Sequence, residues 1–228
     1  MLAIAGGKGG CGKTTTTLGL AAALTRRGFD PLVIDGDCDM PDVHHRLGLP
    51  RRNGVDLLAD GARIQNTAVY SEQIPGVAFV TGGRRDSLDT ALRRTGSWNG
   101  PVLVDCSAGS NRDSLRPLRY ADQAIVVSTE TPQCLEDAAL TRTIAARLST
   151  PPAGTLIRES PTEQRGGANN TMTGRWNILG HLPYVEKPLE NPKSRACFER
   201  VATSLVESQQ STRSQAPANT ETHSMHNL

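Results

Sequence analysis

The sequence predicts a doubly wound α/β fold, in which a mostly parallel sheet carries helices on both faces. Short apolar runs alternate with longer amphipathic stretches, which is the pattern of consecutive β-α-β units. Several of the short runs are apolar at both alternating positions, as expected for strands that are covered on both sides. The 228 residues suit one compact domain, which we expect over residues 1–207.

Seven short apolar runs are the expected strands: Leu2–Ala5, Pro31–Asp35, Val77–Thr81, Val102–Asp105, Ala124–Ser128, Thr155–Arg158 and Ile178–Pro183. Four longer stretches are the expected helices: Lys13–Arg27, Ser87–Arg94, Pro132–Leu148 and Pro192–Glu207. The first of these helices stops at Gly28, a typical C-terminal cap. In the last helix the apolar residues recur three and four positions apart, which indicates a face that packs on the core.

Two internal segments and the C-terminal end are predicted to lack regular structure. Arg51–Gly54 and the Gly- and Asn-rich segment Glu163–Gly174 are expected to be loops. From Ser208 onward the chain is polar and nearly without aliphatic residues, so a disordered tail is expected over residues 208–228. The few apolar residues of this tail are scattered, so it has no face that would bind a membrane by itself.

Composition excludes several classes of protein. The 25 Lys and Arg nearly balance the 23 Asp and Glu, which disfavours a protein that binds polyanions through bulk charge. The five cysteines form no CxxC pair and have no histidine at metal-ligand spacing, so neither a zinc site nor a disulfide framework is expected. The first residues lack the charged segment of a signal peptide, and no run approaches the ~20 apolar residues of a spanning helix. We expect a cytoplasmic protein.

The strongest chemical signal is the run Gly7-Lys8-Gly9-Gly10-Cys11-Gly12-Lys13-Thr14, which fits the phosphate-binding loop pattern GxxxxGK[ST]. It follows an apolar strand and opens a helix, the context that the mechanism needs. Glycines let successive backbone N–H groups surround phosphate oxygens, and the helix N-terminus adds its positive dipole end. We expect nucleotide contacts from Gly9, Gly10, Cys11, Gly12, Lys13, Thr14 and Thr15, with Lys13 on the β- and γ-phosphates and the Thr14 hydroxyl on Mg²⁺.

The second lysine of this loop, Lys8, gives it a closer resemblance. The run resembles the deviant Walker A motif of the MinD/ParA family of ATPases, and Lys8 matches the additional lysine of that motif. In that family the lysine reaches phosphates bound by the partner subunit of an ATP-sandwich dimer. The resemblance therefore implies a homodimer when ATP is bound and a catalytic role for Lys8, comparable to that of an arginine finger.

Carboxylates follow two of the expected strands, at the edge where ligands bind in open α/β sheets. Asp35, Asp37 and Asp39 resemble the family's switch I segment, in which the second Asp, matched by Asp37, positions the attacking water. Asp35 would belong to the second shell of Mg²⁺, and Asp39 is expected to cap the following turn. Asp105 and the residues up to Gly109 resemble the Walker B and switch II segment, which implies that Asp105 holds Mg²⁺ and that Gly109 senses the γ-phosphate.

The sequence departs from the family where the base would bind. Ile157 stands where many members have an asparagine that reads adenine. The loop that begins at Pro183 resembles the family's other base-side element, and Pro183 is expected to contact the nucleotide. Three thiols, Cys11, Cys38 and Cys106, fall in loops around the predicted site. We expect them to fill space rather than to sense redox state.

The resemblance covers about residues 1–207 and implies a slowly hydrolysing MgATP switch that dimerises with ATP and then binds an unidentified activator or cargo protein. In the family such switches serve division-site placement or DNA partition, and this chain looks nearest to archaeal MinD-like members. Two alternatives stay open: a small-molecule ATP-dependent ligase or kinase on the same scaffold, and a nucleotide-binding adaptor without turnover. Nonspecific DNA binding through the pairs Arg26/Arg27, Arg51/Arg52, Arg84/Arg85 and Arg93/Arg94 is a lesser expectation than a solvated surface.

Overall fold

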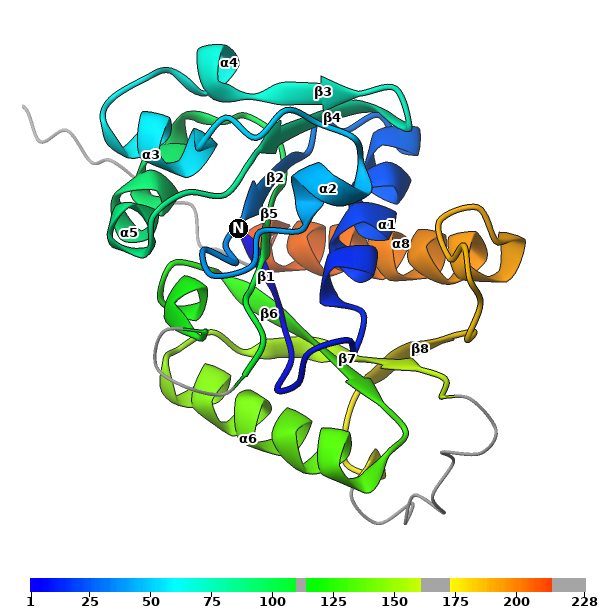
Figure 1. Ribbon diagram of the computed structural model, residues 1–228. Coiled ribbons are helices and arrows are strands. Elements are labelled where there is room, and N and C mark those ends of the chain that lie inside the picture. Colours follow the sequence, from blue (N-terminus) through cyan, green and yellow to red (C-terminus); the bar gives the residue numbers. More distant parts are fainter. Residues whose placement is uncertain (110–113, 161–172, 215–228) are drawn as a thin grey trace, which may run out of the picture.

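A computed structural model describes residues 1–109, 114–160 and 173–214 of the chain. Within these residues one sheet has the strand order β3-β4-β2-β5-β1-β6-β7-β8 (Figure 1). The strands are β1 (Leu2–Ala5), β2 (Leu32–Asp35), β3 (Val69–Ser71), β4 (Ile74–Val80), β5 (Val102–Asp105), β6 (Gln123–Thr129), β7 (Pro152–Arg158) and β8 (Ile178–Leu182).

The predicted α/β fold with a mostly parallel sheet is confirmed. All seven expected strands are present, and they pair in parallel. The edge strand β3 was not expected, and it pairs antiparallel with β4 through a short connection. Strand β4 starts three residues before the predicted Val77. The prediction missed these residues because Pro75 and Gly76 are typical of turns and break the apolar run.

The helices are α1 (Lys13–Arg26), α2 (Val43–Arg46), α3 (Gly54–Ala59), α4 (Ile64–Thr67), α5 (Arg85–Arg94), α6 (Pro132–Arg147) and α8 (Pro192–Ser214). Among the described residues, 3₁₀ turns occur at Thr95–Ser97 and Arg116–Arg119. No helix in the described ranges is long and apolar enough to cross a membrane.

Alternating strand residues bury two separate faces of the sheet. Ile4 and Val33 pack into one core with α1 and α8, which run beside each other on the same face (Figure 1). The neighbouring residues Ala3 and Ala5 pack toward α6, and Ile34 packs toward α3 and α5 on the opposite face. Each of β1, β2 and β5 is covered on both sides and lies in the interior of the strand order, so their C-terminal ends form the middle of one edge of the sheet.

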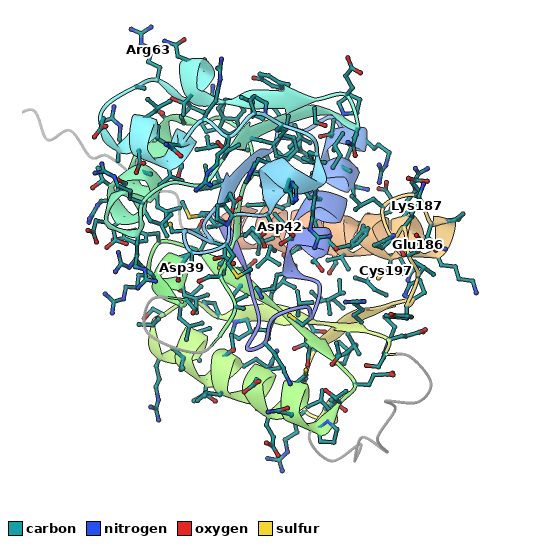
Figure 2. The ribbon with its side chains drawn as sticks, viewed as in Figure 1. Asp39, Asp42, Arg63, Glu186, Lys187 and Cys197 are labelled. Atoms are coloured by element: carbon teal, nitrogen blue, oxygen red, sulfur yellow. The ribbon has the colours of Figure 1, made fainter. Side chains whose placement is uncertain are left out.

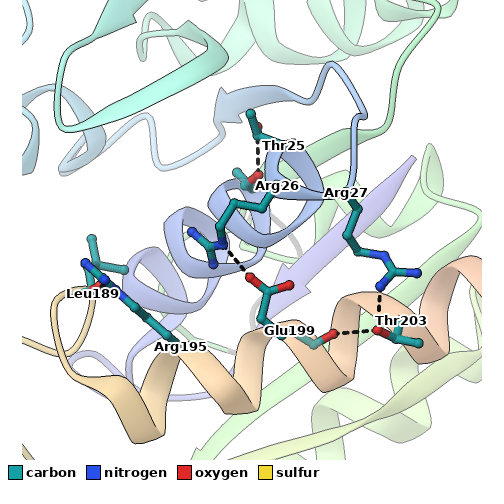
Figure 3. A network of polar contacts seen from close by, with 8 residues as sticks. Thr25, Arg26, Arg27, Leu189, Arg195, Glu199 and Thr203 are labelled. Atoms are coloured by element: carbon teal, nitrogen blue, oxygen red, sulfur yellow. Dashed lines mark hydrogen bonds and ion pairs between the residues drawn. The ribbon is translucent and has the colours of Figure 1, made fainter.

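Helix α8 fixes the helix that carries the phosphate loop. Phe198 of α8 is buried, and its ring occupies the space beside Gly19 of α1, where a side chain would stand only 2.2 Å from the ring. At the end of α1, Arg26 forms an ion pair with Glu199, and the Arg27 guanidinium donates a 2.9 Å hydrogen bond to Thr203 Oγ1 (Figure 3).

The predicted disordered tail is wrong for residues 208–214, because α8 continues to Ser214. The sequence contains neither Gly nor Pro between Lys193 and Ala216, and extending an existing helix by one residue adds one hydrogen bond. Residues 215–228 lie outside the described part of the chain, as do residues 163–172 of the predicted loop Glu163–Gly174. Of the predicted loop Arg51–Gly54, the first three residues are a connection and Gly54 already begins α3.

Candidate functional site

The predicted site residues meet at the edge of the sheet where the central parallel strands end. A cavity of about 670 Å³ opens there between the phosphate loop, the segment after β2, the end of β7 and the segment after β8. Eight of the predicted residues line it: Gly9, Gly10, Gly12, Lys13, Thr14, Thr15, Asp37 and Pro183. The other predicted residues, which are Lys8, Cys11, Asp35, Asp105 and Gly109, are not part of this lining.

The phosphate loop needs glycine at two positions for its backbone conformation. Gly10 and Gly12 have φ angles of 77° and 103°, in the left-handed region where a side chain would be strained. A side chain at Gly7 would stand 2.2 Å from Cβ of Asp137, so the loop also packs closely against α6. This shape places Lys13, the first residue of α1, at the cavity, with 7% of the residue exposed and its Nζ 3.4 Å from the carbonyl oxygen of Lys8.

Lys8 lies on the outer side of the loop. Its side chain is exposed, and its Nζ donates a 2.8 Å hydrogen bond to Oε1 of Gln133 in the first turn of α6. It therefore does not point into the cavity of its own chain, in contrast to Lys13. The loop thus carries two lysines with different directions, one toward the cavity and one toward the surface.

Two buried carboxylates stand side by side behind the loop. Asp35 ends β2 and Asp105 ends β5, and the register of these strands pairs the two residues directly. Asp105 accepts hydrogen bonds from the hydroxyls of Thr14 and Thr17, the latter at 3.2 Å. Asp35 accepts hydrogen bonds from the backbone N–H groups of Val43, at 3.2 Å, and of Asp37, at 3.3 Å.

The electrostatics of this pair fit a divalent cation. Burial, with a further contribution from Asp105, raises the pKa of Asp35 to about 8. Burial also raises the pKa of Asp105 to about 6, although hydrogen bonds from Thr14 and Thr17 and the charge of Lys13 lower it. Carboxylate and hydroxyl oxygens are the ligands that Mg²⁺ uses, and a cation here would stabilise both ionised carboxylates. The residues present therefore fit the predicted magnesium site.

The segment after β2 gives Asp37 and Asp39 different roles. Asp37 is half-buried and lines the cavity, and its Oδ1 accepts a 3.0 Å hydrogen bond from the backbone N–H of Met40. The expectation that Asp39 caps this turn is wrong, because its exposed carboxylate pairs with the Arg85 guanidinium of α5 at 2.6 Å. The positions of the two residues explain why Asp37 caps the turn and Asp39 does not. Asp37 is the first residue of the turn, so its side chain reaches the N–H of Met40 three residues later, whereas Asp39 directly precedes Met40. Figure 2 labels Asp39 on this segment.

The thiols near the site are poorly ionised. Cys11 and Cys106 are buried, and burial raises the pKa of both. Cys38 is half-buried, and burial together with the carboxylates of Asp35, Asp37 and Asp39 raises its pKa to about 11. Reactive thiols are usually ionised near neutral pH, so these values support space filling over redox sensing. Gly109 follows in the segment after β5 with a φ of 107°, directly before residues 110–113, which lie outside the description.

The base side of the cavity contains residues that sequence reasoning missed. Ile157, which stands where the resemblance implies a base-reading asparagine, is only 3% exposed and packs into the core. The next residue, Arg158, lines the cavity, and its Nη1 donates a 2.6 Å hydrogen bond to the carbonyl oxygen of Gly10. Its guanidinium also lies over the ring of Tyr184, with 5.2 Å between Cζ and the ring centroid. The only sequence signal was a cation at the end of a strand, which is too common to assign.

Residues 2–196 match the model of the CobQ/CobB/MinD/ParA nucleotide binding domain. A septum site-determining protein MinD from Synechocystis is 29% identical over 149 residues, which are 60% of this chain and 56% of that protein. The chain thus spans little more than half of the length of this relative.

Two solved structures share the fold. The septum site-determining protein MinD from Pyrococcus horikoshii, complexed with Mg-ADP, superposes with a TM-score of 0.76 at 22% identity, covering 94% of this chain and 98% of that one. Cobyrinic acid a,c-diamide synthase from Mycobacterium smegmatis, with bound ADP and magnesium, gives a TM-score of 0.71 at 21% identity over 93% of this chain and 96% of that one.

Proposed function

Because the chain belongs to the CobQ/CobB/MinD/ParA nucleotide-binding domain family, we propose that it is a magnesium-dependent ATPase that dimerises when ATP is bound. The observation that carries the proposal is the arrangement of the two lysines in one phosphate loop, with Lys13 at the cavity and Lys8 on the outside. We place this activity in residues 1–207 as one domain and expect it in the cytoplasm.

The chain's own residues can perform the phosphate chemistry. The loop N–H groups and Lys13 would bind the β- and γ-phosphates, and Thr14 and Asp105 would hold Mg²⁺ with Asp35 behind them. Mg²⁺, when bound, would neutralise charge that develops on the phosphate oxygens. Asp37 lines the cavity and would orient the attacking water.

A second subunit would complete the site through Lys8. In the single chain this lysine binds Gln133 and cannot neutralise the phosphates of its own cavity while it does so. Release from Gln133 would let it reach the nucleotide of a partner subunit, where a positive charge stabilises the transition state. Turnover would then depend on dimerisation, and the nucleotide state would decide which activator or cargo protein is bound.

The cellular role that fits this switch is spatial positioning, either division-site placement or DNA partition. Direct DNA binding has less support, because most of the paired arginines are engaged within the chain. Arg26 and Arg27 bind α8, Arg84 pairs with Asp56, and Arg85 pairs with Asp39. Among the other pairs, Arg93 lies over the ring of Tyr120 and Arg94 donates to the carbonyl oxygen of Gly61.

Molar mass by light scattering, measured with MgADP and with MgATP, tests the proposal. We expect a dimer only with MgATP, and a dimer that persists in Asp37→Ala, because this variant binds ATP but cannot hydrolyse it. Lys8→Ala should bind MgATP yet stay monomeric. Lys187→Ala is the matched control, since it removes an exposed lysine that pairs with Glu190 three residues later.

A monomer under all conditions, with nucleotide bound, would contradict the role of Lys8 and favour a small-molecule ligase or kinase on this scaffold. The cobyrinic acid a,c-diamide synthase has the same fold, so the fold alone does not separate the two functions. An ATP-bound dimer with no turnover in wild type would favour the non-hydrolysing adaptor.

A further inference from the structure

Arg158 lies across the phosphate loop. It comes from the C-terminal end of β7, and its Nη1 binds the Gly10 carbonyl oxygen at 2.6 Å. Its Cδ fills the open side of Gly12, at 3.3 Å from where a side-chain carbon would stand. The arginine thus contacts the two positions of the loop that have left-handed backbone conformation.

The ring of Tyr184 holds the guanidinium in place. The register of β7 and β8 pairs Arg158 with Leu182, so the segment after β8 passes beside the arginine. The Tyr184 ring then lies 5.2 Å from Cζ, within the range of a cation–π contact. No carboxylate in the described part of the chain forms an ion pair with Arg158, so its charge is not neutralised by an acidic neighbour there.

The hydrogen bond fixes the orientation of one peptide group of the loop. The Gly10 carbonyl and the N–H of Cys11 belong to the same planar, trans peptide, so they point in opposite directions. While Arg158 holds the carbonyl on its own side, the Cys11 N–H is turned toward the other side of the loop. Without this hydrogen bond the peptide would rotate easily, because Gly10 has no side chain to restrict it.

We propose that Arg158 is a positioning residue that, with Tyr184, holds the phosphate loop in its anion-binding conformation before a polyphosphate arrives. This inference rests on the proposed function and concerns how the site binds the phosphates of its ligand. The pair favours binding of the phosphates whatever base they carry, because it acts on the backbone of the loop. A loop that adopts the competent conformation only part of the time binds more weakly in proportion to that fraction.

Affinities of the wild type, Arg158→Lys and Tyr184 variants for ATP, GTP and inorganic tripolyphosphate, each with Mg²⁺, test the proposal by calorimetry. Lysine keeps the charge but loses the planar group that can donate and stack at the same time. We expect Arg158→Lys to weaken all three ligands by the same factor, about tenfold, as for the loss of a hydrogen bond from a charged group. The ATP-to-GTP ratio should stay unchanged.

Tyr184→Ala leaves the arginine in the chain and should reproduce part of this loss, whereas Tyr184→Phe keeps the ring and should bind as the wild type does. This pair keeps the test decisive if a change at Arg158 impairs folding, because Tyr184 is 52% exposed and its removal leaves no buried cavity. Thermal unfolding of each variant confirms that the fold is intact.

Three results would overturn the inference. If the variants bind tripolyphosphate as the wild type does but change the ratio of ATP to GTP affinity, Arg158 and Tyr184 contact the base and do not act on the phosphate loop. If Arg158→Lys binds all three ligands as the wild type does, the positive charge at this position is sufficient and the planar guanidinium has no positioning role. Wild-type binding by Tyr184→Ala would remove the tyrosine from the arrangement. A wild-type protein that binds neither nucleotide nor tripolyphosphate would instead refute the proposed function itself, so the two failures are distinguishable.

Discussion

Substituting Gly19 by alanine should destabilise the protein, although the same change in an ordinary helix stabilises it. Replacing a glycine in a helix interior by alanine typically contributes about 1 kcal/mol to stability. Here the added carbon would stand 2.2, 2.4 and 2.5 Å from three atoms of the Phe198 ring, closer than such carbons approach any atom. Forcing extra volume into a packed core costs up to about 3 kcal/mol. We therefore expect a net loss of about 2 kcal/mol.

Removing the ring should reverse the sign of this effect. Phe198 is 1% exposed, so Phe198→Ala alone should lower the free energy of unfolding by about 3–5 kcal/mol. In that background the alanine at position 19 no longer meets a ring, and Gly19→Ala should raise the free energy of unfolding by about 1 kcal/mol. The two substitutions are then coupled by about 3 kcal/mol.

Urea unfolding followed by circular dichroism measures all four proteins of this cycle. Ala22→Gly is the control within the same helix, and it should lose about 1 kcal/mol as the ordinary cost of a helical glycine. A Gly19→Ala variant that is more stable than the wild type would refute the reasoning. So would an equal effect of the substitution in both backgrounds.

The remaining predictions concern the site. Lys13→Ala should weaken ATP binding at least thirtyfold, about 2 kcal/mol, because the lysine is the buried cation of the cavity; unchanged fluorescent-nucleotide affinity would contradict this. Asp37→Ala should slow phosphate release about a hundredfold or more in a steady-state assay without losing ATP affinity, whereas Asp39→Ala should keep the wild-type rate because Asp39 pairs with Arg85 instead. Modification of Cys38 by a disulfide reagent at pH 7.5 should be about a hundredfold slower than that of an ordinary thiol, because only the thiolate reacts and the pKa of Cys38 is raised to about 11. The rate should rise about tenfold for each pH unit below that pKa. Rapid labelling at pH 7.5 would show that this thiol is ionised.

The central strands were predictable because their burial leaves a direct trace in the sequence. Val102–Asp105 and Leu2–Ala5 are apolar on both faces and end at the predicted residues. The elements between β2 and β4 left no such trace. Helices α2, α3 and α4 have six residues or fewer, too short for a helical period to be recognised, and β3 has only three residues.

The same distinction separates the site residues that sequence reasoning found from those that it missed. Lys13 and Thr14 belong to a local motif, whose spacing follows from the way a backbone loop surrounds a phosphate. The contact between Arg158 and Gly10 joins residues 148 positions apart, and it depends on how β7 lies relative to the loop. The role of Asp39 was wrong for a related reason, since its partner Arg85 lies on a helix 46 positions further along the chain.

The packing of α1 against α8 has a consequence for the order of events during protein synthesis. The phosphate loop and α1 leave the ribosome well before the Phe198 ring of α8, which packs on Gly19. Domains form as their parts emerge, and apolar surface that waits for its partner is prone to aggregate. A nascent chain therefore has the nucleotide-binding motif long before it has the packing that holds it. We expect ATP to bind only after α8 has emerged and packed on α1.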